Sequence, residues 1–278
     1  MSLKEILKKN DFTFQKKFGQ NFLTDGNLLD SIVEKAGIGG NDTVVEVGCG
    51  GGTLTAAIAK KAKRVIGFEI DGNLEPVLKE TLAEYDNTEI IFRDVMKVSA
   101  GEIERIAGGG YAVVANLPYY ITTPVLMKFL EEGENVTSVT VTVQEEVADR
   151  LCALPGTPEY GAITVAVNAA GNAEKVMRIG RNLFYPVPNV DSAVVKITID
   201  RDKYDAETRA MIRSVVRAAL QSRRTTPANN LMQAFKISRA EAESAVAAAG
   251  IEPMTRGETL GVEDYRRLAE RLKERSVL

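Results

Sequence analysis

The sequence predicts an α/β protein in which a mostly parallel sheet is covered by helices, followed by a small all-helical domain. Six short β-rich runs alternate with helical patterns between residues 28 and 200, which is the order that a parallel sheet with crossover helices requires. Beyond Asp200 the β-rich runs stop and only helical patterns follow. The chain has 278 residues, enough for one large and one small domain, which we place at 1–200 and 201–278.

The predicted strands are short runs rich in β-branched residues. They lie at 43–47, 64–69, 89–93, 111–115, 136–143 and 193–199. Apolar residues recur at helical spacing near 28–36, 53–62, 73–84, 123–131 and 145–152. A capping box of Ser2 and Glu5 indicates a short leading helix. In the second domain, helices are expected at 205–222, 226–235, 238–249 and 262–275.

The composition excludes several kinds of chemistry, because the chain has no histidine and two cysteines. Without histidine there is no Ser-His-Asp or Cys-His nucleophile and no histidine base or metal ligand. Cys49 and Cys152 are too few for a four-cysteine zinc site or a disulfide framework, so no metal is expected. No signal-peptide pattern follows the amino-terminal lysines, and the uncharged stretch 106–127 contains glycines and prolines unsuited to a membrane span. We therefore expect a cytoplasmic protein without membrane association.

A glycine-rich turn follows the first predicted strand, in the segment Val-Val-Glu-Val-Gly-Cys-Gly-Gly-Gly-Thr at 44–53. Glycines let the backbone approach a ligand at the carboxyl edge of the strand, where open α/β sheets bind nucleosides. Gly48 and Gly50 fit the first two positions of the dinucleotide fingerprint, but Thr53 stands at the third. This mismatch disfavours an NAD-dependent oxidoreductase, although a glycine motif alone also fits an ordinary turn.

Acidic residues end the next two predicted strands. Glu69 lies 21 residues after Gly48, where a carboxylate can accept hydrogen bonds from the ribose hydroxyls of a nucleoside. Asp94 follows the third strand and can accept from an adenine amino group. Either acid alone fits a solvated strand end. Together with the glycine turn they indicate an adenosine ligand without phosphate, because a Walker lysine and a third fingerprint glycine are both missing.

The fourth predicted strand ends in Asn116-Leu117-Pro118-Tyr119. Pro118 restrains Leu117 to extended conformations, so the carbonyls of Asn116 and Leu117 can face outward. The Asn116 side-chain oxygen and the Leu117 carbonyl can then each accept one hydrogen of a planar exocyclic amine, with Tyr119 stacked on the ring. A loop with buried tyrosines is the competing interpretation.

The sequence resembles the KsgA (RsmA) family of S-adenosylmethionine-dependent ribosomal RNA adenine dimethyltransferases, from about Phe14 to Tyr265. The resemblance rests on the motifs above and on further segments that are widely spaced in the chain. These segments are Gln15-Lys16-Lys17-Phe18-Gly19-Gln20-Asn21-Phe22-Leu23, Phe184-Tyr185-Pro186-Val187-Pro188, Val190-Asp191-Ser192-Ala193-Val194-Val195 and Arg223-Arg224. It implies a Rossmann-like class I methyltransferase domain with a mostly parallel seven-stranded sheet.

The resemblance also implies roles for individual residues. The cofactor-contacting positions are matched by Asn21, Leu23, Gly48, Gly50, Glu69, Asp94 and Asn116. Asn116, Leu117, Pro118 and Tyr119 would hold the target adenine, Phe184 would stack on its other side, and residues 1–27 would cap the cleft. The implied reaction places two methyl groups on each of two adjacent adenines near the 3′ end of 16S rRNA, in the small (30S) ribosomal subunit or its precursor, and releases S-adenosylhomocysteine. Such a transfer depends on alignment more than on a base, which fits a chain without histidine.

The net charge of −3 is the sum of segments of opposite sign. Residues 1–20 carry +3 and residues 201–230 carry +4, so the rest of the chain carries −10. Arg209, Arg213 and Arg217 recur every four residues and share one face of a predicted helix. Basic stripes are commonly solvated faces. The resemblance favours phosphate contact, through the set Lys16, Lys17, Arg217, Arg223 and Arg224.

Some positions depart from the family's pattern. Cys49 stands where proline is common, Glu145 where lysine is common, and Thr225-Thr226-Pro227 follows the paired arginines. The last two departures put the predicted contacts with RNA in doubt rather than the predicted methyl transfer. Two alternatives remain open: a noncatalytic ribosome-assembly factor on this fold, and a methyltransferase that acts on large-subunit rRNA. A monomer is expected, because no heptad pattern is present.

Overall fold

The computed structural model describes residues 1–222 and 225–278, which form two compact units. The first unit contains Met1–Ala148 and Ala173–Ile199, and the second contains Asp149–Asn172 and Asp200–Leu278. Within the described ranges, no helix has the length and apolar character needed to cross a membrane.

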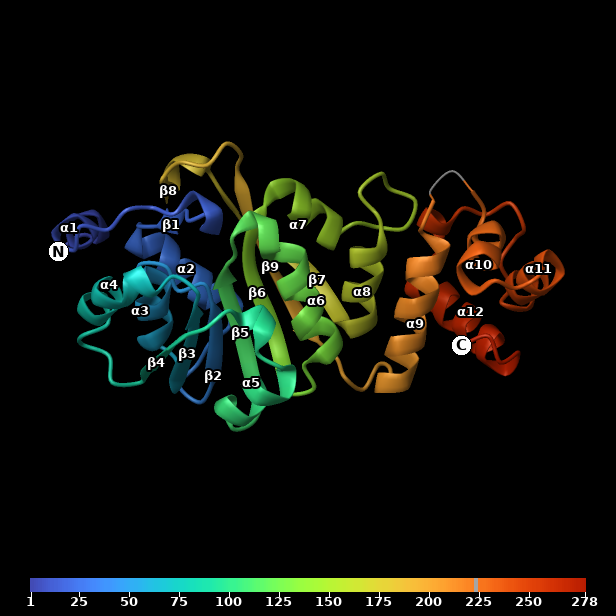
Figure 1. Cartoon of the computed structure of the whole chain (residues 1–278), viewed down its shortest axis with the longest axis horizontal. Helices are drawn as coiled ribbons and strands as arrows, with labels where there is room; N and C mark the ends of the chain where they lie inside the picture. The colour runs from blue at the N-terminus through green and yellow to red at the C-terminus, as the bar shows by residue number, and fades with distance from the viewer. Residues whose placement is uncertain (223–224) are drawn as a thin grey trace. The chain divides into compact units, whose positions relative to one another are not determined.

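A seven-stranded sheet with the order β4, β3, β2, β5, β6, β9, β7 forms the centre of the first unit (Figure 1). The strands are β2 (Thr43–Val47), β3 (Arg64–Glu69), β4 (Thr88–Phe92), β5 (Tyr111–Asn116), β6 (Val136–Gln144), β7 (Gly171–Ile179) and β9 (Ser192–Ile199). Strands β2 to β6 pair in parallel, and β9 is antiparallel to β6. This confirms the predicted fold class. The chain order reverses between β2 and β5, and such switch points are where open α/β sheets bind ligands.

Helices cover both faces of the sheet. They are α2 (Gly26–Ala36), α3 (Thr53–Ala59), α4 (Glu75–Thr81), α5 (Ala100–Ala107) and α6 (Thr122–Glu132). Helix α7 (Glu145–Leu151) follows β6, and its residues are divided between the two units. Val44 packs with α2 and α3 in one apolar cluster, while the next residue, Val45, faces the opposite side and is equally inaccessible to solvent. Because successive strand residues point to opposite faces, both faces must be covered.

The amino-terminal segment is folded against this core. Helix α1 (Leu3–Lys9) begins with the predicted capping box of Ser2 and Glu5 and contacts α4. Its apolar face is buried with Phe22 and Leu78 in one cluster. Strand β1 (Phe22–Leu23) then pairs with β8 (Phe184–Tyr185) in a separate two-stranded sheet. Residues from both ends of the first unit therefore meet beside the main sheet.

Helix α5, strand β7 and helix α8 (Ala162–Ala170) were absent from the predicted elements. Helix α5 carries a local start signal, because the Ser99 hydroxyl accepts from the Glu102 N–H. Strand β7 lies at the edge of the sheet, and of its residues only Gly171 and Ile179 are buried, so it lacks the apolar run that marks a central strand. Helix α8 has the sequence Ala-Ile-Thr-Val-Ala-Val-Asn-Ala-Ala, whose β-branched residues disfavour a helix locally. Its burial in a helical core outweighs that preference.

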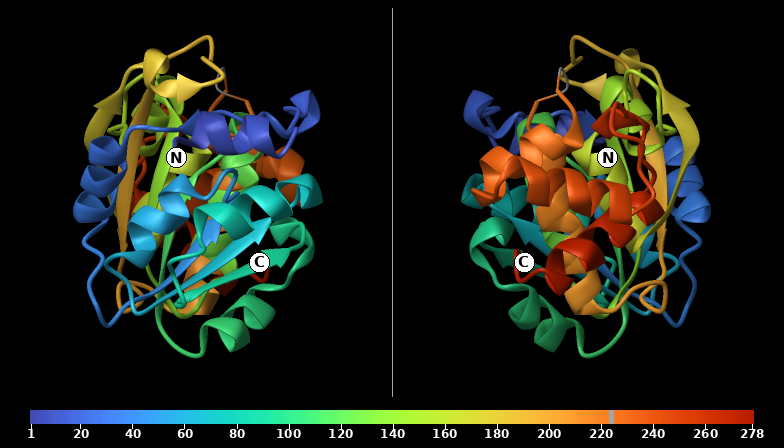
Figure 2. Two further views of the ribbon diagram at one scale, coloured as in Figure 1. Left: turned by 90° about the vertical axis from the view of Figure 1, so that its left-hand side faces the viewer. Right: turned by 90° about the vertical axis from the view of Figure 1, so that its right-hand side faces the viewer.

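The second unit is helical. Besides α8 it contains α9 (Ala206–Ala219), α10 (Pro227–Phe235), α11 (Arg239–Ala248) and α12 (Val262–Glu274), of which the last four are seen together in Figure 2. Two buried tyrosines make hydrogen bonds to loops of this unit. The Tyr160 hydroxyl donates to the Leu260 carbonyl at 2.7 Å, and the Tyr265 hydroxyl donates to the Gly257 carbonyl at 2.8 Å. Segment 149–172, which the sequence analysis assigned to the first domain, belongs to this compact unit.

Candidate active site

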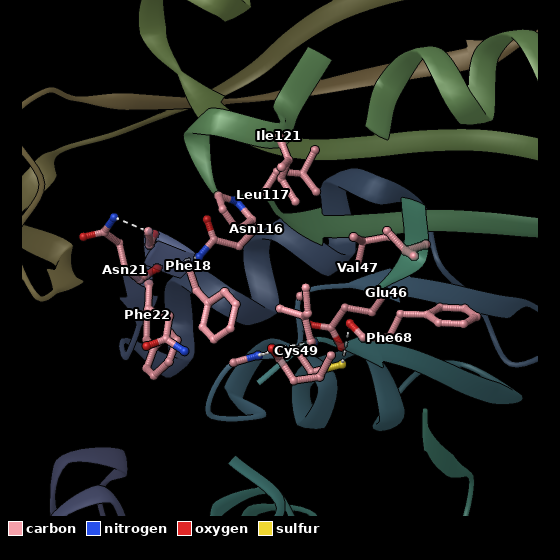
Figure 3. Close-up of a pocket in the computed structure, with 18 of the residues that line it drawn as sticks. Phe18, Asn21, Phe22, Glu46, Val47, Cys49, Phe68, Asn116, Leu117 and Ile121 are labelled. Carbon is pink, nitrogen blue, oxygen red and sulfur yellow. Dashed lines mark hydrogen bonds between the residues drawn. The ribbon is translucent and has the colours of Figure 1, made fainter. Parts of the chain in front are cut away.

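A cavity of about 260 Å³ opens in the first unit at the carboxyl ends of β2, β3, β4 and β5 (Figure 3). It is lined by turns that follow these strands and by segment 18–23 of the chain's beginning. Figure 3 shows Asn21 and Asn116 on one side of the cavity and Glu46, Cys49 and Phe68 on another. The structure thus collects at one place groups that lie almost a hundred residues apart in sequence.

The turn after β2 is shaped by its glycines. Gly48 and Gly50 have φ values of 76° and 53°, a left-handed conformation that other residues rarely adopt. A Cβ on Gly50 would lie 2.7 Å from the Phe22 ring, and one on Gly51 would lie 2.5 Å from a Leu3 methyl group. Gly50 and Gly51 therefore allow the amino-terminal segment to pack directly against this turn. Thr53, the mismatch to the dinucleotide fingerprint, donates its hydroxyl to the Leu23 carbonyl at 2.7 Å and so ties α3 to β1.

Glu69 is fixed by backbone hydrogen bonds at the end of β3. Its Oε2 accepts from the Gly50 N–H, and its Oε1 accepts from those of Ile70 and Asp71, all at 2.8 Å. Burial raises the pKa of Glu69, and the three N–H donors partly oppose this rise. A carboxylate has about four acceptor positions, so capacity remains for a ligand hydroxyl in the cavity. The carboxylate is oriented before any ligand arrives.

Asp94 caps the short helical turn Val95–Lys97, with its Oδ1 accepting from the Met96 N–H at 3.0 Å. Its second oxygen makes no hydrogen bond within the ranges described. Ile70 and Met96 line the cavity and are 47% and 38% exposed. Exposed apolar side chains beside an acceptor suit a flat, partly apolar ring. Neither residue was predicted from the sequence, although Ile70 comes one residue after Glu69 and Met96 two residues after Asp94.

Asn116 lies at the end of β5 and is held by the amino-terminal segment. Its Nδ2 donates to the Asn21 carbonyl at 2.9 Å, which fixes the amide and leaves Oδ1 as the acceptor at the cavity. The Leu117 N–H donates to the Thr142 carbonyl of β6 at 3.3 Å. This bond occupies the Leu117 N–H. Asn116 and Leu117 both line the cavity, and their roles as paired acceptors stay a prediction.

Tyr119 follows Pro118 and is anchored at its far end. Its hydroxyl lies 2.9 Å from Oγ of Ser192, the first residue of β9. Burial raises the pKa of Tyr119, while the hydrogen bond to Ser192 opposes the rise. Tyr120 is 56% exposed and its ring lies over Gly19. Both tyrosines line the cavity, so the aromatic part of the motif is not buried in the core as the competing interpretation requires.

Phe184 lies elsewhere. It is 3% exposed, pairs with Leu23 across β1 and β8, and packs into the apolar cluster of α2 and α3. Among the residues described, those lining the cavity do not include Phe184. Its stacking on a target base stays a prediction from the resemblance, which would require Phe184 to leave this position.

The residues expected to contact RNA are found in both units. Lys16 and Lys17 are exposed in the turn Lys16–Phe18, with the Lys17 ammonium 4.6 Å from the centre of the Phe18 ring. Arg217 is exposed on α9. Arg223 and Arg224 lie outside the described residues. In the described part of the chain, no group of three or more Cys, Asp or Glu residues is arranged to hold a metal ion.

Gln20 and Glu46 contribute to the site without having been predicted. The Gln20 side chain donates to the buried Asp71 at 2.8 Å and accepts from the Gln15 N–H at 2.9 Å, so it joins the amino-terminal segment to the turn after β3. Glu46 lines the cavity yet is 1% exposed, and neither of its carboxylate oxygens has a hydrogen-bond partner at normal distance among described residues. An interior strand position gives no sequence signal for such a site residue.

Replacing Glu46 by glutamine is expected to stabilise the protein more at pH 8 than at pH 5.5. Burial raises the pKa of Glu46 from 4.5 to about 8, with Glu69 adding to the rise and Thr55 and Cys49 opposing it. Between pH 4.5 and about pH 8 the native state keeps a proton on Glu46 that the unfolded state has lost. The free energy of unfolding therefore falls as pH rises, by on the order of 1 kcal/mol per pH unit. Glutamine is neutral throughout and avoids this loss. Thermal unfolding across this pH range measures the difference.

Glu84, exposed after α4, supplies the control. Glu84→Gln should leave the pH dependence of unfolding unchanged. A constant offset between wild type and Glu46→Gln from pH 5.5 to 8 would contradict a buried, protonated Glu46.

Comparison with solved structures defines the class of protein. The structure is similar to that of the 23S rRNA methyltransferase ErmE, with a TM-score of 0.69 and 28% identity over 91% of this chain and 100% of that chain. A dimethyladenosine transferase from Plasmodium falciparum has the same fold, with a TM-score of 0.77 and 23% identity over 92% of this chain and 98% of that chain. Fold and site together define an α/β methyltransferase.

Sequence comparison then gives the family. Two relatives named ribosomal RNA small subunit methyltransferase A are each 44% identical to this chain. The match to the relative from Clostridioides difficile covers 94% of this chain and 92% of the relative. The match to the relative from Geobacillus thermodenitrificans covers 97% of this chain and 94% of the relative. The family model for ribosomal RNA adenine dimethylase matches residues 11–274. The chain belongs to the ribosomal RNA adenine dimethylase family, as its motifs predicted.

Proposed function

We propose that this protein transfers methyl groups from S-adenosylmethionine to N6 of two adjacent adenines near the 3′ end of 16S rRNA, two to each base. The observation that carries the proposal is the Asn116 amide, whose nitrogen is bound to the Asn21 carbonyl so that its oxygen is left for the cavity. A fixed amide oxygen beside the Leu117 carbonyl matches an amine with two hydrogens. The similarity to small subunit methyltransferases supports this choice of RNA.

The residues of the cavity fit the cofactor. S-adenosylmethionine, when bound, supplies a methyl group that its sulfonium has already activated. The free acceptor capacity of Glu69 suits ribose hydroxyls, and the second oxygen of Asp94 suits an adenine amino group. Gly48 in the turn after β2 lines the cavity together with Asn21 and Leu23 of the amino-terminal segment.

Alignment of the amine is the main contribution of the chain to the reaction. Asn116 and Leu117 hold the amino hydrogens so that the N6 lone pair faces the methyl carbon. The bound cofactor would supply the methyl group as an electrophile, and the electron pair of its S–C bond would stay on sulfur as N6 takes the methyl. The methylated nitrogen is then strongly acidic and loses one proton to water. No base in the chain is needed, which agrees with a site that contains no histidine.

RNA is held, in this proposal, by phosphate contacts from Lys16 and Lys17 in the first unit and from Arg217, Arg223 and Arg224 in the second. The substrate is the small subunit or its precursor in the cytoplasm, and the protein acts as a monomer. Such contacts release counterions, so RNA affinity should fall steeply as salt increases.

Methyl transfer from labelled S-adenosylmethionine to unmethylated small subunits tests the proposal. We expect four methyl groups per particle, all on N6 of two neighbouring adenines, as mapped by digestion and mass spectrometry. Large subunits from the same cells are the control and should remain unlabelled.

Three other outcomes would each contradict the proposal. Labelling of large subunits would favour the activity named for ErmE. Thermal stabilisation by S-adenosylhomocysteine without methyl transfer to either subunit would favour an assembly factor. Stabilisation by NAD but not by S-adenosylhomocysteine would favour an oxidoreductase.

A further inference from the structure

Ser192 connects the amine-binding motif to a distant strand. It is fully buried at the start of β9, and its Oγ lies 2.9 Å from the Tyr119 hydroxyl. Tyr119 follows β5, whereas β9 lies beyond β6, so the hydrogen bond crosses an intervening strand of the sheet. The tyrosine is therefore held at two ends, by its backbone after Pro118 and by its hydroxyl.

The residue before Ser192 is fixed by a network of its own. The backbone carbonyl of Asp191 accepts from the Glu145 N–H at 3.1 Å. The side-chain Oδ1 of Asp191 accepts from the Arg181 N–H at 3.0 Å. Arg178 joins both acids, with Nε 3.0 Å from Glu145 and Nη2 3.3 Å from Asp191. Glu145, a departure from the family's pattern, thus has a place in this network. Ser192 thus begins β9 beside a bonded neighbour and is itself fully buried, which suits it to hold the Tyr119 hydroxyl in place.

We propose that Ser192 is a positioning residue that holds the far end of the Tyr119 ring in place, and that this fixed ring position governs addition of the second methyl group. The inference rests on the proposed function. An unmodified adenine offers two hydrogens to the two acceptors, Asn116 Oδ1 and the Leu117 carbonyl. A monomethylated adenine offers one, so it loses a hydrogen bond and depends more on the stacked ring for its alignment.

The test is a single-turnover assay of Ser192→Ala on two short RNAs, one with adenine and one with N6-monomethyladenine at the target position. Loss of one hydrogen bond should slow transfer to the monomethylated RNA by about threefold to tenfold more than transfer to the unmodified RNA. Mass spectrometry should accordingly show monomethyladenine accumulating on small subunits. A merely structural role for Ser192 would slow both transfers equally.

Two further variants isolate the hydrogen bond. Tyr119→Phe removes the other partner of the hydrogen bond, so it should change the ratio of monomethylated to dimethylated adenine as Ser192→Ala does. The double variant should give the same ratio as either single variant. Thr140→Val is the matched control, because the Thr140 hydroxyl is buried in β6 and has no hydrogen-bond partner among the described residues. It should leave the product ratio unchanged.

The outcomes separate this inference from the proposed function. If wild-type protein methylates no adenine in small subunits, the proposed function fails. If wild type dimethylates them and Ser192→Ala and Tyr119→Phe both give the same product ratio as wild type, the positioning role alone is overturned. Additive effects of the two variants would also overturn it.

Discussion

Replacing Asn116 by alanine is expected to slow methyl transfer by about 10²-fold to 10³-fold at saturating cofactor and RNA. The variant removes an amine acceptor and also the bond to the Asn21 carbonyl, so the amine loses its alignment. The loss should appear in the rate of a single turnover, because alignment acts on the chemical step. Quench-flow measurement of labelled methyl transfer gives this rate directly.

Asn116→Asp shows whether the orientation of the amide matters. Aspartate keeps the acceptor oxygens but has no N–H for the Asn21 carbonyl, and its charge would be repelled by that oxygen. We expect a loss comparable to that of alanine. Asn189→Ala, at an exposed position, is the control and should keep the wild-type rate. If Asn116→Ala binds cofactor and RNA and retains near-wild-type turnover, the alignment role is wrong.

Replacing Glu69 by glutamine is expected to weaken binding of S-adenosylhomocysteine by about tenfold to a hundredfold, the effect of losing hydrogen bonds to a charged acceptor. Three backbone N–H groups converge on this carboxylate. An amide can place its oxygen toward only one side, and its NH₂ group then faces a backbone donor. The turn after β2 loses its fixed geometry together with the charge. Isothermal titration calorimetry measures the affinity.

Glu75→Gln provides the control for charge alone, because Glu75 is exposed on α4 and forms a surface ion pair with Lys79. Such pairs contribute little, so both affinity and stability should be unchanged. Unaltered S-adenosylhomocysteine affinity in a folded Glu69→Gln protein would show that Glu69 does not bind the ribose.

The strands around the switch point were predictable because their composition and their place in the chain agree. Val44 and Val45 are buried on opposite faces, so β2 is covered on both sides as a central strand of a parallel sheet is. Strand β7 was missed because an edge strand needs little apolar surface, and α8 because its β-branched residues oppose the helix that tertiary burial imposes. These two errors fall where packing outweighs local preference, whereas the third missed element, α5, begins with a local signal in Ser99 and Glu102.

The family, the fold class and the set of polar groups at the strand ends could be predicted from the amino-acid sequence alone. These follow from local pattern: glycines after β2, an acid at the end of β3, and Asn116 to Tyr119 from the end of β5 onward. The orientation of those groups depends on tertiary contacts. The bond from Asn116 to Asn21 joins residues 95 apart, and that from Tyr119 to Ser192 joins residues 73 apart. Such contacts depend on which strands become neighbours, and local pattern does not encode this because the sheet order is fixed by packing of the whole unit.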